Sequence, residues 1–135
     1  NELWLGFTSL TGAIPSELGN LAQLKELYLA NNNLTGPIPS ELGNLTQLIN
    51  LSLGDNNLTG EIPLELGNLA QLTGMYVQGN NLTGLMPQFY CSLNLDGSLG
   101  DNNFCPPYPT CLTNTQIGTQ DTTNCSSNGP GGSIP

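Results

Sequence analysis

The chain has 135 residues, enough for one domain, and its one basic residue against ten acidic residues gives a net charge of −9. Without cationic side chains to neutralise phosphates, the composition excludes nucleic-acid binding, and it disfavours anionic membrane surfaces for the same reason. No stretch approaches the roughly 20 apolar residues of a membrane-spanning helix, so we expect no membrane insertion.

A stretch from Leu34 to Leu45, reading LTGPIPSELGNL, recurs with small changes over residues 10–21 and again over residues 58–69. A constant spacing in this range indicates one supersecondary unit stacked on copies of itself. We therefore expect a solenoid in which each repeat buries its apolar residues against the repeats on either side.

The two clearest units cover residues 24–47 and 48–71 and follow the pattern L-x-x-L-x-L-x-x-N-x-L. The alternation of Leu27 with Leu29, repeated by Leu51 with Leu53, predicts short strands with one buried face. Strands in the same phase should stack as a parallel sheet with neighbours about 4.8 Å apart.

Asparagines 32, 56 and 80 share one inward position of the repeat, where Thr8 stands in the first unit. Because a buried amide needs partners, we expect these asparagines to bond the backbone of adjacent coils. The glycines at 12, 36, 60 and 84 are expected to serve close packing or a positive φ. The prolines at 15, 39, 63 and 87 should fix an extended corner, after which Ser16 and Ser40 are expected to cap helical turns.

The pattern degrades after Leu72, and the strand that ends near Leu99 is reached two residues early. We expect repeats over residues 1–104, a cysteine-containing cap over 105–128 and a linker over 129–135. No comparable cap precedes Asn1, which predicts further repeats upstream.

All four cysteines lie near the C-terminus, and the sequence has no histidine; they are Cys91, Cys105, Cys111 and Cys125. An even number without Cys-x-x-Cys spacing indicates two disulfides rather than zinc. Three pairings are open, and the degraded repeat favours Cys91–Cys105 with Cys111–Cys125. Six Asn-x-Ser/Thr sequons, some inherited from the repeat, add to an expectation of an extracellular, secreted or cell-surface glycoprotein. They begin at Asn33, Asn44, Asn50, Asn57, Asn81 and Asn124.

The motif N-x-L-T-G-x-I-P-x-x-L-G-x-L-x-x-L, matched throughout by residues 32–48 and 56–72, resembles the plant-specific class of leucine-rich repeats. That class occurs in ectodomains of receptor-like kinases, receptor-like proteins and polygalacturonase-inhibiting proteins. The resemblance implies an α/β right-handed solenoid with a concave parallel β-sheet, a second short sheet near Leu-Thr-Gly and short 3-10 or helical turns on the convex side. The cysteine-rich end then forms a disulfide-bonded C-terminal cap.

With the phase of the repeat known, the outward strand positions can be aligned in columns. Exposed aromatic residues beside acids and amides form our candidate ligand-binding surface; they are Trp4, Tyr28, Tyr76, Glu2, Glu26, Asp55 and Gln78. Trp and Tyr combine large contact area with a polar group, which suits recognition of a protein, peptide or glycan. The competing interpretation is that Trp4 covers apolar surface and that Tyr28 is an ordinary strand residue.

We expect no enzyme, no cofactor and no metal site. There is no histidine, the only lysine is Lys25 at a strand edge, and Asp55 and Asp101 lie two repeats apart, too far for a shared-proton pair. An alternative is a structural or ice-binding solenoid that uses columns of threonine and asparagine side by side. Those columns are Thr11, Thr35, Thr59 and Thr83, and Asn33, Asn57, Asn81 and Asn103. A further alternative is a protein similar to polygalacturonase inhibitors, whose acidic concave face would suit a basic target enzyme.

Overall fold

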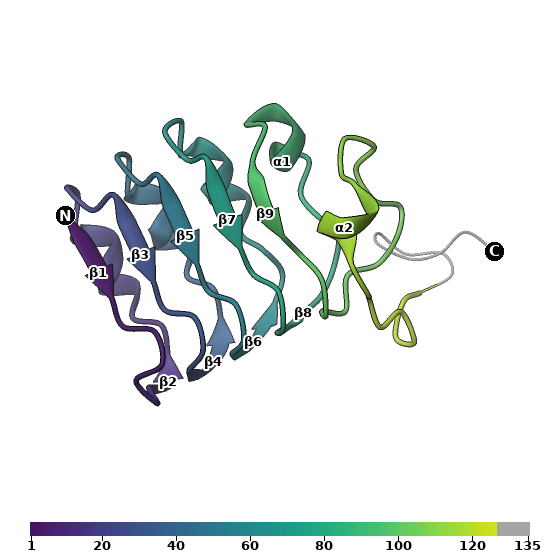
Figure 1. Ribbon diagram of the computed structural model, residues 1–135, viewed down its shortest axis with the longest axis horizontal. Coiled ribbons are helices and arrows are strands. Elements are labelled where there is room, and N and C mark those ends of the chain that lie inside the picture. The colour runs from purple at the N-terminus through teal and green to yellow at the C-terminus, as the bar shows by residue number, and fades with distance from the viewer. Residues whose placement is uncertain (127–135) are drawn as a thin grey trace.

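The computed structural model describes residues 1–126 and shows coils stacked along one axis (Figure 1). Each coil contributes one strand to a five-stranded parallel sheet of order β1-β3-β5-β7-β9. These strands are β1 (Glu2–Trp4), β3 (Glu26–Tyr28), β5 (Asn50–Ser52), β7 (Gly74–Tyr76) and β9 (Asp96–Ser98). As far as β7, partners are equivalent residues of consecutive repeats, and the pairing of Gly74 with Asp96 confirms that the last coil is two residues shorter. The predicted linker lies outside the described residues.

A second parallel sheet runs along another side of the coils, with four strands in the order β2-β4-β6-β8. The strands are β2 (Thr11–Ala13), β4 (Asn33–Pro37), β6 (Asn57–Gly60) and β8 (Asn81–Leu82). Here partners are not equivalent residues of the repeat, since Thr35 pairs with Asn57 rather than with Thr59. The predicted separate threonine and asparagine columns are therefore wrong in detail. The sheet is staggered by two residues per coil, and Thr11, Thr35 and Thr59 each lie beside the asparagine of the next coil.

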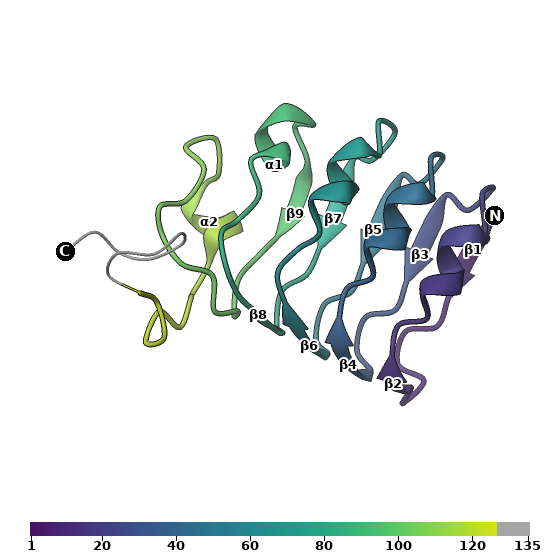
Figure 2. The ribbon, with the colours of Figure 1, turned by 180° about the vertical axis from the view of Figure 1, so that it is seen from behind.

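Short 3-10 turns cover the opposite side of the coils from the five-stranded sheet, as the view from behind shows (Figure 2). They are η1 (Ser16–Asn20), η2 (Ser40–Asn44) and η3 (Leu64–Asn68), each preceded by proline at a φ between −67° and −62°. The predicted serine caps are wrong. No side chain caps these turns, and Ser16 and Ser40 instead reach the neighbouring glutamates at 3.4 and 3.5 Å.

Leucines from the two sheets and the 3-10 turns form one continuous core. Coils stack closely on this core: a Cβ placed on Gly43 would lie 2.7 Å from the carbonyl oxygen of Glu65 in the next coil. The first coil is less covered than the others, because Leu21 is 46% exposed whereas its equivalents Leu45 and Leu69 are fully buried. Burial therefore depends on having a coil on both sides.

The inward asparagines form the predicted ladder between the two sheets. In the rung at Asn56, Oδ1 accepts from Leu34 N at 3.0 Å, and Nδ2 donates to the carbonyl oxygens of Leu29 and Leu53, each at 3.1 Å. These bonds satisfy backbone groups of the preceding coil and of the same coil. Asn102 continues the ladder beyond the three predicted rungs with the same bonds.

The helix α1 (Phe89–Ser92) packs on η3 in the coil before β9, and the C-terminal segment closes the stack with the short helix α2 (Asn114–Ile117) and two disulfides. The disulfides join Cys91 to Cys111 and Cys105 to Cys125, each with Cα atoms 5.7 Å apart, so the favoured pairing is wrong. The path of the chain explains the difference. Cys91 lies in α1, and Cys105 N still donates to Gly84 O of the preceding coil, so each bridge ties a residue stacked on a coil to the segment that follows.

Gln120 of the cap takes the place of a further asparagine rung. Its Nε2 donates to the carbonyl oxygens of Leu99 at 2.8 Å and Ile117 at 2.7 Å, and its Oε1 accepts from Phe104 N at 3.0 Å. These are the bonds that an inward asparagine makes one coil earlier. The cap is thus a shortened coil that ends the ladder with a longer amide.

Candidate functional site

Aromatic and acidic side chains pair along the exposed side of the five-stranded sheet. At its N-terminal end, the rings of Trp4 and Tyr28 stack with centroids 3.8 Å apart. Trp4 Nε1 donates to Glu2 at 3.0 Å, and Tyr28 Oη donates to Glu26 Oε2 at 2.7 Å. The predicted columns place these four residues in adjacent strands, and the strand register confirms that placement.

A second phenol–carboxylate hydrogen bond lies two coils later, where Tyr76 Oη donates to Asp96 Oδ2 of the next strand at 3.3 Å. We call these six residues, Glu2, Trp4, Glu26, Tyr28, Tyr76 and Asp96, the aromatic–acid surface. Asp96 was missed as a site residue, although it occupies the same column of the repeat as Glu2 and Glu26. That shared column was the signal that could have found it.

Asn50 and Gly74 are paired in the register of the sheet and lie between the two groups. Asn50 Nδ2 donates to Glu26 Oε2 at 2.9 Å, so one carboxylate oxygen receives two hydrogen bonds. A side chain on Gly74 would collide with the amide oxygen of Asn50 and approach the ring of Tyr76 to 3.1 Å. The absence of a side chain at position 74 leaves room for these neighbouring groups to lie flat along the sheet.

The electrostatics of this surface follow from the acids. The hydrogen bond to Glu26, with partial burial and the negative charge of that carboxylate, raises the pKa of Tyr28 to about 12. Burial first, and then Asp96, raises the pKa of Tyr76. Both phenols therefore remain protonated donors at neutral pH, and the second oxygen of Glu26 has no hydrogen bond within residues 1–126. That oxygen can accept from a ligand.

Asp55 and Gln78 are placed differently from the other predicted residues. Asp55 has a φ of 56°, and it shares this left-handed turn position with Asn31 and Asp101, residue types that tolerate the conformation. Gln78 lies against Gly54, where a Cβ would collide with its amide, and its Oε1 is buried without a hydrogen-bond partner among the described residues. Neither contacts the aromatic–acid surface through a hydrogen bond, so their role in binding stays a prediction.

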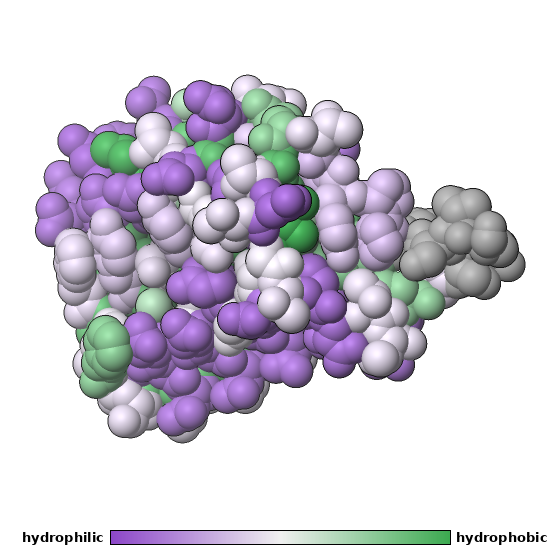
Figure 3. Space-filling view, turned by 45° about the vertical axis from the view of Figure 1, so that its right-hand side comes forward, coloured by the Kyte–Doolittle hydropathy of each residue, from purple (hydrophilic) through white to green (hydrophobic). Residues whose placement is uncertain are grey.

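The exposed surface is shallow rather than deeply hollowed. A depression of about 440 Å³ lies beside the Trp4–Tyr28 stack, lined also by Phe7, Asn31 and Ser52. Figure 3 shows scattered green residues on a mostly purple and white surface, so this side of the molecule is largely polar.

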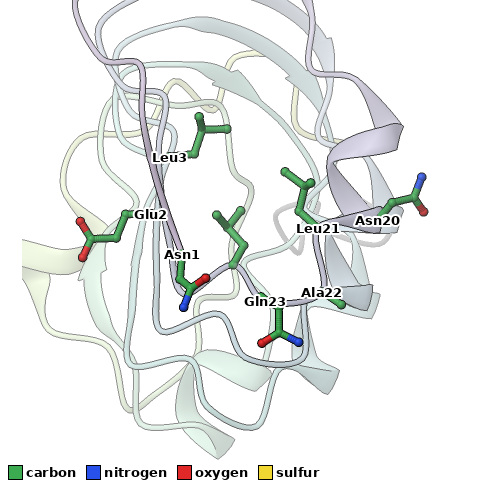
Figure 4. Close-up of a pocket in the computed structure, with 8 residues that line it drawn as sticks. Asn1, Glu2, Leu3, Asn20, Leu21, Ala22 and Gln23 are labelled. Atoms are coloured by element: carbon green, nitrogen blue, oxygen red, sulfur yellow. The ribbon is translucent and has the colours of Figure 1, made fainter.

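A hollow of about 500 Å³ lies at the edge of the first coil, between the start of β1 and the turn after η1 (Figure 4). Its lining includes one charged residue, Glu2, and the exposed Leu21. In later coils the neighbouring coil covers the equivalent positions, so this hollow reflects stacking and brings no reactive groups together.

Within residues 1–126, no three His, Cys, Asp or Glu side chains are grouped to hold a metal ion. None of the helices in this part of the chain has the length and apolar character needed to cross a membrane. The aromatic–acid surface itself offers hydrogen bonding, ring stacking and negative charge.

The two parallel sheets, the 3-10 turns and the asparagine ladder define a leucine-rich-repeat solenoid. The family model described as Leucine Rich Repeat matches residues 23–45 and 47–69. The chain thus has the leucine-rich-repeat fold, and it is similar to ectodomains of plant receptors. No curated protein sequence gives a significant match.

Three solved structures illustrate the similarity. The plant peptide hormone receptor RGFR1 in complex with RGF2 is 32% identical, with a TM-score of 0.77, over 81% of this chain and 18% of the receptor chain. The BIR2 ectodomain from Arabidopsis thaliana is 29% identical, with a TM-score of 0.78, over 90% of this chain and 69% of that chain. A plant ice-binding protein is 34% identical, with a TM-score of 0.70, over 76% of this chain and 34% of that chain. The chain therefore spans less than a fifth of the hormone receptor's length.

Proposed function

We propose that the chain is a non-enzymatic binding module of an extracellular protein, and that its five-stranded sheet recognises a protein or peptide carrying basic residues. The observation that carries this proposal is the aromatic–acid surface, where a stacked Trp4–Tyr28 pair lies between two carboxylates. The similar plant hormone receptor is itself in complex with RGF2, which supports a peptide ligand.

A basic side chain fits the chemistry of this surface. The planar guanidinium of arginine stacks on aromatic faces and donates to carboxylates at the same time. Trp4 and Tyr28 provide the rings, and the unused carboxylate oxygen of Glu26 provides an acceptor beside them. A net charge of −9 adds long-range attraction for a basic partner and speeds its association at low salt.

The surface is also ordered before a ligand arrives. The phenols of Tyr28 and Tyr76 are each held by a carboxylate, so these rings lose less conformational freedom on binding than free side chains would. The disulfides and the set of sequons fit a module that works in an oxidising, extracellular setting.

The test is selection of random peptides on the immobilised 135-residue chain, followed by calorimetry on the enriched peptides. We expect enrichment of Arg and Lys, and we expect Tyr28→Ala with Tyr76→Ala to weaken binding at least tenfold, about 1.4 kcal/mol. Glu26→Gln should weaken it more than Glu65→Gln, which makes the same charge change on η3. Peptides without basic residues would refute the proposed ligand class, and equal binding by the tyrosine double variant would refute the site.

A further inference from the structure

The outward side of the four-stranded sheet carries a second regular set of polar side chains. We call it the Thr–Asn face, and it consists of Thr11, Asn33, Thr35, Asn57, Thr59, Asn81 and Thr83. All seven are exposed, whereas the leucines between them, such as Leu34 and Leu58, are buried. Along each strand, residues of this face alternate with buried core residues, as expected for a sheet with one side exposed to solvent.

None of these seven side chains makes a hydrogen bond to another group within residues 1–126. The inward asparagines contrast with them, since each rung from Asn32 to Asn102 makes several bonds. The Leu and Gly of the Leu-Thr-Gly motif have structural roles: Leu34 is buried and Gly36 has a φ of 76°. The threonine hydroxyl between them is needed neither for packing nor for backbone geometry.

The backbone fixes the spacing of this face. The register places Thr11 beside Asn33, Thr35 beside Asn57 and Thr59 beside Asn81. Neighbouring strands are about 4.8 Å apart, and successive outward residues on one strand are about 6.8 Å apart. Hydroxyls, amides and threonine methyl groups therefore repeat on a rigid two-dimensional lattice.

Charge is nearly absent from the face. At the next outward position of each coil stand Ala13, Pro37, Glu61 and Leu85, so Glu61 is the one acidic side chain at the positions described. A charged face would hold its own hydration shell strongly, because removing water from an ion is costly. A neutral face of donors and acceptors can exchange loosely held water for another ordered partner.

We propose that the Thr–Asn face binds ice. Each hydroxyl and amide both donates and accepts hydrogen bonds, which matches a surface of water molecules that does the same. Immobilising free water on a protein costs entropy, but water in ice is already immobilised. Threonine is stiff at χ1, so the face also loses little rotamer freedom. The binding uses the other sheet from the proposed ligand site and is independent of it.

The test uses the 135-residue chain produced without glycans, because the sequons at Asn33, Asn57 and Asn81 lie on this face. Thermal hysteresis and inhibition of ice recrystallisation are measured for the unaltered chain and for Thr35→Lys with Thr59→Lys. The matched control is Thr46→Lys with Thr110→Lys. Both threonines are exposed and lie outside this sheet, and neither side chain forms a hydrogen bond among the described residues.

We expect the unaltered chain and the control to be active and the face variant to lose activity, with circular dichroism showing all three folded. Asn33→Ala with Asn57→Ala, which leaves the net charge unchanged, should also lower activity. If Thr35→Lys with Thr59→Lys unfolds the sheet, the activity of this asparagine variant tests the proposal instead. An inactive unaltered chain would overturn the proposal, as would a folded face variant as active as the control.

Discussion

Asn56 and Asn57 are neighbours in the sequence and carry the same side chain, yet they face opposite environments. Asn56 is 7% exposed and bonds four backbone groups in two coils, whereas Asn57 is exposed and has no side-chain bond within residues 1–126. The same contrast holds for Asn32 with Asn33 and for Asn80 with Asn81. Both columns recur with the same period, so repetition alone does not separate a structural residue from a surface residue.

The two sheets differ in a related way. On the five-stranded sheet, polar groups pair with one another, as Tyr28 does with Glu26, and the pairing creates local sites of defined charge. On the four-stranded sheet, the threonines and asparagines of the Thr–Asn face form no side-chain hydrogen bonds among the described residues and produce a uniform surface. A paired surface suits recognition of one shaped ligand, and an unpaired lattice suits a ligand that is itself periodic.

The largest expected effect separates the two asparagine columns. Asn56→Ala leaves Leu34 N without its partner and removes one of the two amide donors to each of the carbonyl oxygens of Leu29 and Leu53, so we expect a loss of about 3 kcal/mol in the free energy of unfolding. Asn57→Ala should change the free energy of unfolding by less than about 0.5 kcal/mol. Urea denaturation of both variants measures the difference, and equal losses would contradict the division into inner and outer columns.

The inner column was predictable from the sequence because the repeat places Asn32, Asn56 and Asn80 between inward leucines. The columns of the five-stranded sheet were predictable for the same reason, since strands in one phase pair directly, as Glu2 does with Glu26. A constant period determines which residues are equivalent. It therefore predicted the fold and the placement of Trp4, Tyr28 and Tyr76.

The period does not determine the strand register, that is, the offset between paired strands of neighbouring coils. The two-residue stagger that pairs Thr35 with Asn57 arises from the geometry of the stacked coils, and no residue type marks it. The disulfide pairing was equally hidden, because the route of the chain from Cys91 to Cys111 follows a cap without repeats. Gln120 lies in that cap, outside the repeats, so no column identified it as a rung.

Gln120 tests whether the cap truly ends the inner column. Gln120→Ala removes the partner of Phe104 N and of the carbonyl oxygen of Ile117, and one of the two amide donors to the carbonyl oxygen of Leu99. Because this residue is only half-buried and lies at the end of the stack, we expect a loss of about 1.5 kcal/mol, smaller than for Asn56→Ala. Gln88→Ala, at an exposed position, is the control in the same urea titration. A loss no greater than that of the control would show that the cap closes the core without its amide.

The smallest expected effect concerns the five-stranded sheet, whose polar side chains are paired. It is a change in the pKa of Tyr28, measured by ultraviolet titration of the tyrosines. The pKa of Tyr28 is raised to about 12 because its hydroxyl donates to Glu26, so Glu26→Gln should return it toward 10, while Glu65→Gln should leave it unchanged.

A phenol whose pKa is higher in the folded state than in the unfolded state stabilises the fold fully below pH 10. That contribution is lost between pH 10 and about 12. The unaltered chain should therefore lose more stability across this interval than Glu26→Gln does. Identical titrations for the two chains would mean that the carboxylate does not hold the phenol, and the five-stranded sheet would then resemble the unpaired Thr–Asn face.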